Sequence, residues 1–365
     1  MDTSEAEVIG TNGGTSLWIG TSNRGFGKLA ASELQRMFDK AKTQSLSPGD
    51  VYRFEVDAGR EQAIERIRAT PPIFLRHMQP ADRALPIGDA QATLAAIRAA
   101  VAEAGLLFRG KKVAVQARKA EPPQTPIADL PPIEVKRVVD DALTNVYGAI
   151  PVVRDMEYIV SVYAARDTVY IGWSTPAENL SSWSGGAVHF RKEDGDISRA
   201  KYKLMEAEEV FGLRFDAFHS ALDLGAAPGG WSSLLLEREL RVTAVDPADV
   251  HPSLLREPGF TYLRKNAADV SFPEGAFDLL VCDMSWDPVH MAGMVKRLLP
   301  AVSDDGLVLT TVKLMHGKAF ATLREVERTM EPEARLERAR QLFHNREEVT
   351  CLWRKRKGRF EAADG

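Results

Sequence analysis

Polar residues at the ends of predicted strands are the part of this sequence best suited to chemistry. Asp246, Asn266, Asp283 and Lys313 each follow a short apolar run, and an earlier run of the same kind contains Asp223. The carboxyl ends of parallel strands meet at one edge of a sheet, where ligands bind. Each residue alone could be a solvated strand end, but several at one edge favour a common site.

Residues 221–231, with the sequence ALDLGAAPGGW, predict how a ligand is held at that edge. A strand containing Asp223 leads into a glycine-rich turn, and a helical pattern follows over 232–240. Glycine lets the backbone pass close to a ligand. The dinucleotide pattern Gly-x-Gly-x-x-Gly is absent, and no Lys-Ser or Lys-Thr pair follows as in a phosphate loop. An acid beside such a turn favours a cationic ligand such as S-adenosylmethionine (SAM), and an ordinary glycine turn is the alternative.

Two of the strand-end residues could complete a nucleoside site. Asp246 lies 23 positions after Asp223, where an acid accepts hydrogen bonds from ribose hydroxyls in folds of this type. Asn266 follows the next predicted strand, and its side-chain amide could meet the edge of an adenine ring. The spacing therefore predicts that both residues contact the nucleoside part of the ligand.

The composition of the 365-residue chain is that of a globular protein with two or three domains. Cys282 and Cys351 lie in apolar runs without metal-type spacing, so we expect two buried, reduced thiols, no metal site and a cytoplasmic protein. No apolar run is long enough to span a membrane, and the start of the chain is unlike a signal peptide.

The net charge of −4 argues against a uniformly basic surface but allows local basic patches. Two clusters of basic residues could bind phosphate groups, although a solvated face is the usual explanation of such runs. They are Arg109, Lys111, Lys112, Arg118 and Lys119, and then Arg354, Lys355, Arg356, Lys357 and Arg359.

The order of strand and helix patterns predicts three folded units in an α/β chain. The first unit has strands at 17–20 and 51–56 with one helix between them and one after. The second has a helix at 89–103, a strand at 112–118 and a hairpin over 158–173, whereas the third alternates strands and helices as in a parallel, doubly wound sheet. The expected divisions are a loose tail at 1–14, α+β domains at 15–85 and 86–175, a linker at 176–186 and a Rossmann-like domain at 187–365.

Five motifs of the third unit resemble those of the FtsJ-type (RrmJ-type) RNA 2′-O-ribose methyltransferases. Residues 222–232 resemble the family's cofactor motif, SRAKYKL at 198–204 its first catalytic helix, and HNREEVT at 344–350 its glutamate-bearing strand. Asp283 and Lys313 match its catalytic aspartate and second lysine. The last of these stretches and the CDM sequence around Asp283 favour the RlmM-type branch, which methylates a cytidine ribose of large-subunit (23S) ribosomal RNA.

The resemblance implies a catalytic Lys-Asp-Lys-Glu tetrad on a SAM-binding, Rossmann-like sheet. The tetrad falls on Lys203, Asp283, Lys313 and Glu348, and Glu347 is a rival for the glutamate. Lys313 would take the proton of the ribose hydroxyl, because a neutral hydroxyl is a poor nucleophile. At Asn266 the chain departs from the acid that the family often carries. The implied cofactor-binding residues are Ser198, Asp223, Gly225, Ala227, Pro228, Gly229, Gly230, Trp231, Asp246, Asn266 and Asp283.

The front of the chain resembles the domains that accompany this branch. Residues from 15 to 85 resemble a ferredoxin-like domain, and residues 86–175 resemble a THUMP domain. The resemblance implies that these domains bind structured RNA, in this case ribosomal RNA, and we expect contacts with its phosphates. Such an enzyme would need neither a metal nor a membrane.

Two other functions are compatible with parts of the sequence. THUMP domains also accompany guanine-N2 methyltransferases, but those carry an Asn-Pro-Pro-Tyr-like motif where this chain has Asp-Met-Ser-Trp at 283–286. An RNA-binding or ribosome-assembly factor with a vestigial site is the other alternative. A complete tetrad argues against it, and equal methyl transfer by wild type and Lys313→Ala would favour it.

Overall fold

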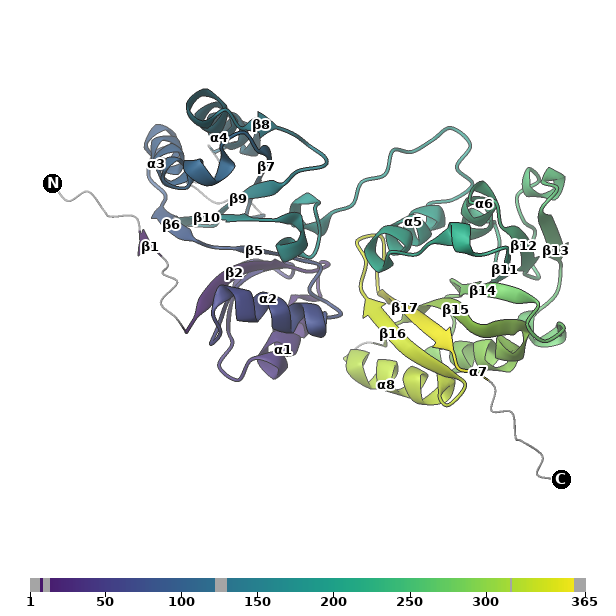
Figure 1. Cartoon of the computed structure of the whole chain (residues 1–365). Helices are drawn as coiled ribbons and strands as arrows, with labels where there is room; N and C mark the ends of the chain where they lie inside the picture. The colour runs from purple at the N-terminus through teal and green to yellow at the C-terminus, as the bar shows by residue number, and fades with distance from the viewer. Residues whose placement is uncertain (1–6, 9–13, 122–129, 316, 358–365) are drawn as a thin grey trace. The chain divides into compact units, whose positions relative to one another are not determined.

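A computed structural model describes residues 7–8, 14–121, 130–315 and 317–357 of the chain. The chain forms two compact units, Met1–Ala187 and Val188–Gly365 (Figure 1). No helix of the described residues is long and apolar enough to cross a membrane.

The first unit begins with a four-stranded antiparallel sheet in the order β3-β4-β2-β5. The buried faces of its two helices carry Ala30 and Leu34 in one and Ala63, Ile64 and Ile67 in the other. These elements are β2 (Ser16–Thr21), α1 (Gly27–Met37), β3 (Lys42–Ser47), β4 (Val51–Val56), α2 (Arg60–Ala69) and β5 (His77–Pro80).

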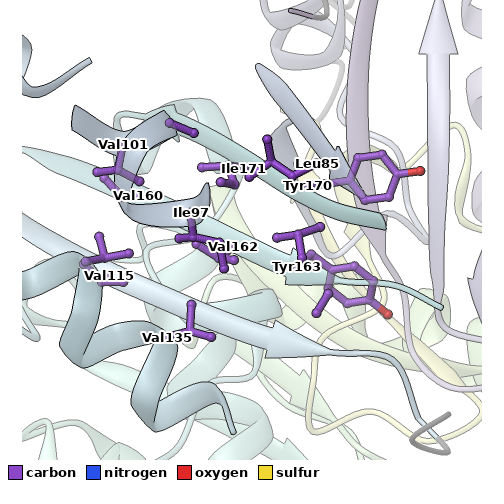
Figure 2. Close-up of a cluster of buried hydrophobic side chains, with 14 of the residues drawn as sticks. Leu85, Ile97, Val101, Val115, Val135, Val160, Val162, Tyr163, Tyr170 and Ile171 are labelled. Carbon is purple, nitrogen blue, oxygen red and sulfur yellow. The ribbon is translucent and has the colours of Figure 1, made fainter. Parts of the chain in front are cut away.

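A six-stranded sheet in the order β1-β6-β10-β9-β7-β8 completes the first unit. Ile97 and Val101 of one helix and Val135 of another pack with Val160 and other strand residues in its core (Figure 2). The elements are β1 (Glu7–Val8), β6 (Arg83–Pro86), α3 (Ala90–Glu103), η1 (Gly105–Phe108), β7 (Lys112–Lys119), α4 (Pro132–Tyr147), β8 (Ile150–Pro151), β9 (Tyr158–Ala164) and β10 (Thr168–Ser174).

Two segments of the first unit differ from the sequence-based expectation. Within the expected loose tail, Glu7 and Val8 pair with Ala84 and Arg83 of β6, while residues 1–6 and 9–13 lie outside the described part of the chain. Strand β6 itself belongs to the second sheet, although the first predicted domain extends to residue 85.

The predicted linker at 176–186 packs against the first unit. It forms two turns, η3 (Pro176–Asn179) and η4 (Ser184–Gly186), and Asn179 is buried. Gln116 Nε2 donates to the Ser182 carbonyl over 2.7 Å, and Arg76 Nε donates to the Gly185 carbonyl over 3.1 Å. A Cβ at Gly185 would lie 2.4 Å from the Arg118 guanidinium, so glycine here permits close packing rather than free movement.

The second unit has a seven-stranded sheet in the order β13-β12-β11-β14-β15-β17-β16. The first five strands in this order are parallel, and the last two pair antiparallel. This is the Rossmann-like, mixed α/β sheet expected of residues 187–365, whereas the pattern does not predict β16. The elements are α5 (Ala200–Phe211), β11 (Ser220–Leu224), α6 (Gly230–Glu237), β12 (Arg241–Val245), β13 (Phe260–Leu263), β14 (Phe277–Cys282), α7 (Pro288–Leu298), β15 (Val302–Lys313), α8 (Ala319–Met330), β16 (Ala334–Arg340) and β17 (Glu348–Lys355).

Candidate active site

The register of the second sheet brings the predicted strand-end residues to one edge. Leu224 of β11 is aligned with Val245 of β12 and with Cys282 of β14, so the glycine turn, Asp246 and Asp283 begin at the same level. The chain runs outward from β11 to β13 and then returns to the other side of β11 as β14. Such a reversal of strand order opens a crevice at the carboxyl ends of the strands.

The glycines of the turn are required by neighbouring protein atoms. Gly225 and Gly229 have φ angles of +72° and +115°, which residues with a Cβ rarely adopt. A Cβ at Gly225 would lie 2.2 Å from Met284 Cγ, and one at Gly229 would lie 2.1 Å from Leu254 Cδ1. A Cβ at Gly230 would lie 2.3 Å from Ser198 Oγ. The turn is therefore packed tightly between the end of β14 and the segment before α5.

Asp223 lies beneath the turn and is buried. Its Oδ2 accepts a hydrogen bond of 2.7 Å from Ser232 Oγ at the start of α6. Burial, together with the neighbouring carboxylates of Asp283 and Asp246, raises the pKa of Asp223 to about 7. A cation in the crevice would relieve this repulsion among three carboxylates. The residues around the turn thus fit the sulfonium and ammonium groups of SAM, which are both positive.

Some of the other expected cofactor residues form hydrogen bonds within the protein, and others are exposed. Asp246 shapes the turn, because its two oxygens accept from the backbone amides of Ala227 at 3.0 Å and Ala248 at 2.7 Å. Trp231 is buried and donates from Nε1 to the Ala200 carbonyl over 2.9 Å, so it joins α6 to α5. Asn266 is exposed beyond β13, 3.4 Å from an oxygen of Asp269. Pro228 is also exposed, in the turn between β11 and α6.

Lys203 joins two acids that are distant in the sequence. From α5 its Nζ donates to Asp283 Oδ1 and Oδ2 at 3.0 and 3.2 Å, and to Glu348 Oε1 at 2.9 Å. These residues are 80 and 145 positions away from Lys203. About a sixth of each side chain is exposed, with values of 16%, 17% and 16% for the lysine, the aspartate and the glutamate. Three members of the predicted tetrad are therefore in direct contact.

Burial and the neighbouring charges shift the pKa values of the three groups in different ways. Burial alone would lower the pKa of Lys203, but the carboxylates of Asp283 and Glu348 outweigh it and raise the pKa. Burial would raise the pKa of Glu348, whereas hydrogen bonds from Lys203 and the Arg346 amide lower it overall. For Asp283 burial prevails, and its pKa is raised despite Lys203 and Thr311. Asp283 is consequently the acid in this group that protonates more readily as pH falls.

Lys313 reaches the same region from the end of β15. It is aligned with Glu348 of β17, and directly opposed residues of an antiparallel pair have neighbouring side chains on one face. Thr311, two positions earlier on that face, donates to Asp283 Oδ1 over 2.7 Å. Lys313 is exposed, and no described residue forms an ion pair or side-chain hydrogen bond with it. Lys313 is therefore an exposed residue at the strand position next to Glu348.

The two candidate glutamates have different surroundings. Glu348 accepts from Lys203 and, through Oε2, from the Arg346 amide at 2.6 Å. Glu347 is exposed, and its carbonyl accepts from the Leu314 amide at 2.7 Å. The geometry therefore favours Glu348 as the acid that contacts Lys203.

Two supporting residues have no counterpart among the residues singled out from the sequence. Glu206 on α5 is buried and accepts from the amides of Phe343 and His344 at 2.7 and 2.9 Å, which holds the segment before β17 against α5. Thr311 orients Asp283, as described above. Glu206 lies three positions after Lys203 on the same helix, and that spacing could have indicated a shared face.

The basic clusters are mostly engaged within the protein. Arg118 donates to Thr21 Oγ1 and Gln79 Oε1, each at 3.0 Å, so it belongs to the interior of the first unit. Arg109 and Lys112 are exposed there, and Lys111 pairs with Glu157. The four described residues of the second cluster all form ion pairs, and Arg359 lies outside the described part of the chain. Those ion pairs are Arg354–Glu337, Lys355–Asp304, Arg356–Glu331 and Lys357–Asp305.

The two cysteines are buried and free, which agrees with the expected reduced thiols. Among the described residues no group of three or more histidines, cysteines or acids is arranged to hold a metal ion.

Comparison with known proteins identifies one part of the chain. Residues 197–352 match the family of FtsJ-like methyltransferases. The protein named Ribosomal RNA large subunit methyltransferase M from Methylococcus capsulatus is 33% identical over 201 residues, which cover 52% of this chain and 55% of the relative. Its namesake from Azotobacter vinelandii is 32% identical over 198 residues, 50% and 54% of the two chains. The chain thus spans about half the length of these curated relatives.

A longer but weaker similarity extends beyond this region. The protein of the same name from Pseudomonas entomophila is 27% identical over 261 residues, which cover 67% of this chain and 68% of the relative. Among solved structures, TrmN from Thermus thermophilus aligns over 93% of this chain and 99% of its own at 16% identity, with a TM-score of 0.37. A score this low supports no argument about the fold or the activity.

Proposed function

From the premise that residues 197–352 are an FtsJ-like methyltransferase domain, we propose that the chain transfers the methyl group of SAM to a ribose 2′-hydroxyl of RNA. The RNA we propose is large-subunit (23S) ribosomal RNA, because the relatives described above are named for methylation of that RNA. The choice of a cytidine as its acceptor nucleotide rests on the resemblance of the motifs at 282–284 and 344–350 alone. The proposal includes a cytoplasmic location, where ribosomal RNA is available in bacteria.

One observation carries the choice of a ribose hydroxyl as acceptor. Lys203 Nζ lies within 3.2 Å of Asp283 and within 2.9 Å of Glu348, and Lys313 is aligned with Glu348 on the neighbouring strand. This grouping supports the Lys-Asp-Lys-Glu tetrad that the sequence motifs imply. A hydroxyl acceptor needs a group that orients it and takes its proton, and two lysines with two acids supply both.

SAM, when bound, supplies an electrophilic methyl group on a sulfonium. The glycine turn and the negative charge of the neighbouring carboxylates, Asp246 included, would hold that cation at the carboxyl end of β11, where the strand order reverses. Lys313 Nζ, in its neutral amine form, would take the proton from the acceptor hydroxyl. Lys203 and Asp283 orient the hydroxyl along the line of transfer, because the methyl moves in a single in-line displacement.

Asp283 and Glu348 both form their ion pairs with Lys203, and neither forms one with Lys313. Both carboxylates accept hydrogen bonds from Lys203 Nζ, Asp283 at 3.0 Å and Glu348 at 2.9 Å. Glu348 fixes Lys203, and Thr311 fixes Asp283 from β15. Lys313 therefore remains available to the acceptor hydroxyl, while Lys203 remains charged.

The first unit has the proposed role of binding RNA. We assign residues 15–85 to a ferredoxin-like domain and 86–175 to a THUMP-like domain, with residues 187–365 as the catalytic domain. Exposed cations such as Arg109 and Lys112 would contact phosphates, so RNA affinity should fall as salt increases. The C-terminal cluster is left out of this role, because its described members pair with acids.

Methyl transfer to defined RNA tests the proposal. Large-subunit ribosomal RNA from a strain without the gene is incubated with the full chain and labelled SAM, and incorporation is compared with RNA from the parent strain. We expect labelling of the first RNA only, and its loss in Lys313→Ala. Lys318→Ala is the matched control, because this lysine is also exposed in the segment between β15 and α8. Equal labelling by wild type and Lys313→Ala would overturn the proposed role of Lys313.

A further inference from the structure

Several exposed apolar side chains of the second unit follow strand ends that carry candidate site residues. Among its described residues, the large apolar side chains with more than a third of their surface exposed are Leu255, Trp286, Val289 and Met315, at 60%, 41%, 40% and 49%. Trp286 and Val289 follow Asp283 at the end of β14, and Met315 follows Lys313 at the end of β15. Three of these four residues thus follow the two adjacent strands that end in proposed catalytic residues.

The strand ends that carry these residues are tied together. Cys282 of β14 is aligned with Thr310 of β15, and the next residue on β15, Thr311, donates to Asp283 over 2.7 Å. The segments that begin at Asp283 and Lys313 therefore leave the sheet side by side. Scattered apolar residues are ordinary on protein surfaces, but a set that follows two adjacent strand ends with proposed catalytic residues favours contact with a ligand.

Trp286 is held in place although it is exposed. Asp287 caps α7 by accepting from the amides of Val289 and His290 at 3.1 and 3.0 Å, which fixes the residue after Trp286. The His290 ring meets the indole edge to face, with 5.4 Å between ring centres and 67° between the planes. One face of an ordered indole can therefore meet a ligand without first losing conformational freedom.

We propose that Trp286 stacks on an unstacked nucleobase of the RNA substrate, with Val289 and Met315 as flanking apolar contacts. This inference rests on the proposed function, because it places the base beside the ribose that Lys313 would deprotonate. The base is that of the target nucleotide or of its immediate neighbour. Indole stacks on any base, so Trp286 positions the nucleotide and does not select it.

Trp286 would act on catalysis through the position of the ribose. A stacked base is fixed at one end of its glycosidic bond, which limits the places that the 2′-hydroxyl can take beside Lys313. Removal of the indole should therefore lower kcat/KM for RNA by about tenfold to a hundredfold, the range of a single base–aromatic stack. Binding of SAM should not change, since the donor is held by the glycine turn.

Three substitutions at one position separate stacking from simple burial. Trp286→Ala and Trp286→Leu should both lose the stated kcat/KM, whereas Trp286→Phe should restore most of it because it keeps an aromatic face. Leu255→Ala is the matched control, since it removes an exposed apolar side chain of the same unit away from β14 and β15. Equal kcat/KM for the Leu and Phe variants would overturn the proposal.

The base itself can be removed while the acceptor hydroxyl stays. Synthetic RNA fragments that span the methylated position carry an abasic ribose either at that position or at its 3′ neighbour. On one of these fragments wild type and Trp286→Ala should methylate at the same rate, and that fragment identifies the stacked base. A full effect of Trp286→Ala on both fragments would show that the indole contacts something else, such as a protein partner, and would overturn the proposal.

A measurement that does not depend on methyl transfer tests stacking on Trp286 separately from the proposed function. Stacking quenches indole fluorescence, so addition of the unmodified fragment should quench wild type more than Trp286→Phe. Quenching without methylation would leave the stacking proposal standing and overturn the proposed function. Methylation without this difference in quenching would do the reverse.

Discussion

The two sides of the candidate site are built in different ways. On the side that would hold SAM, the turn at Gly225–Gly230, Asp223 and Asp246 come from one short stretch of chain. Hydrogen bonds within that stretch join Asp246 to the Ala227 amide and Asp223 to Ser232. On the acceptor side, Lys203 and Glu348 are 145 positions apart and meet only through the folded sheet. The donor side is a local structure, whereas the acceptor side depends on the whole fold of the second unit.

This difference predicts that substitutions should separate binding of SAM from methyl transfer. Changes on the acceptor side should abolish transfer and leave SAM affinity unchanged. Changes in the turn should weaken SAM binding and stability together.

The largest effect is expected for Lys203→Met. Without the ammonium group, Asp283 and Glu348 face each other uncompensated, and we expect the rate of methyl transfer to fall by about a thousandfold, which is about 4 kcal/mol. SAM affinity, measured by calorimetry, should stay within about twofold. The matched control is Lys201→Met, which removes a buried lysine of the same helix that pairs with Asp196 and Glu237. It should lower stability as well but keep transfer, and a comparable loss of transfer in both variants would contradict the comparison.

Gly229→Ala should have the largest effect on the donor side. At φ +115° its Cβ would lie 2.1 Å from Leu254, so we expect a loss of about 3 kcal/mol in the free energy of unfolding and weaker SAM binding. Gly293→Ala is the control, because this glycine lies in α7 with no atom within 4 Å of the added Cβ. It should raise stability by about 0.5–1 kcal/mol. Chemical denaturation measures both, and an unchanged Gly229→Ala would show that the turn is not tightly packed.

The pH dependence of stability should report the buried acid of the donor side. The pKa of Asp223 in the folded protein, about 7, lies above its ordinary value of 3.8, so the folded state binds a proton between these values that the unfolded state has lost. Its contribution to stability is therefore complete below pH 4 and is lost as the pH rises toward 7, by about 2 kcal/mol between pH 5 and 7. Asp223→Asn should lack this part of the decline in urea titrations, while Asp269→Asn, an exposed acid, should retain it.

The smallest effect on methyl transfer is expected for the two candidate glutamates, Glu347 and Glu348. Glu348→Gln keeps an oxygen for Lys203 but removes the charge, and transfer should fall by about tenfold, near 1.4 kcal/mol. Glu347→Gln should leave transfer unchanged, because that side chain is exposed. Initial rates at saturating SAM decide the matter, and the opposite ranking would move the tetrad glutamate to position 347.

The sequence could predict the donor side because its signals are local. A strand, three glycines and two acids within one stretch specify the turn and the end of β12, and the structure has a strand, a turn, a helix and a second strand at these positions. The same patterns could not predict that Trp231 points into the protein toward Ala200, or that Gly225 and Gly229 are needed for contacts with Met284 and Leu254. Those properties depend on segments that pack from elsewhere in the chain.

Sequence patterns could not predict the contacts of the acceptor side or of the surface charges, because those contacts join residues distant in the sequence. Only the family resemblance joined Lys203 to Glu348, because no spacing in the sequence relates residues of α5 and β17. Charge runs were ambiguous for the same reason: Lys355 pairs with Asp304 and Arg354 with Glu337, partners that lie 51 and 17 positions away. The predicted linker at 176–186 is packed because its glycines fit against Arg118 and His77, which composition alone does not indicate.

The position of the transferred methyl group tests the central claim most directly. Ribosomal RNA labelled by the full chain with SAM is hydrolysed completely in alkali, which cleaves after every ribose that has a free 2′-hydroxyl. We predict that the label remains in a dinucleotide resistant to alkali, whose 5′ residue is the methylated nucleotide. Label recovered only in mononucleotides would mean methylation of a base, and would contradict the acceptor chemistry assigned to Lys203, Asp283, Lys313 and Glu348.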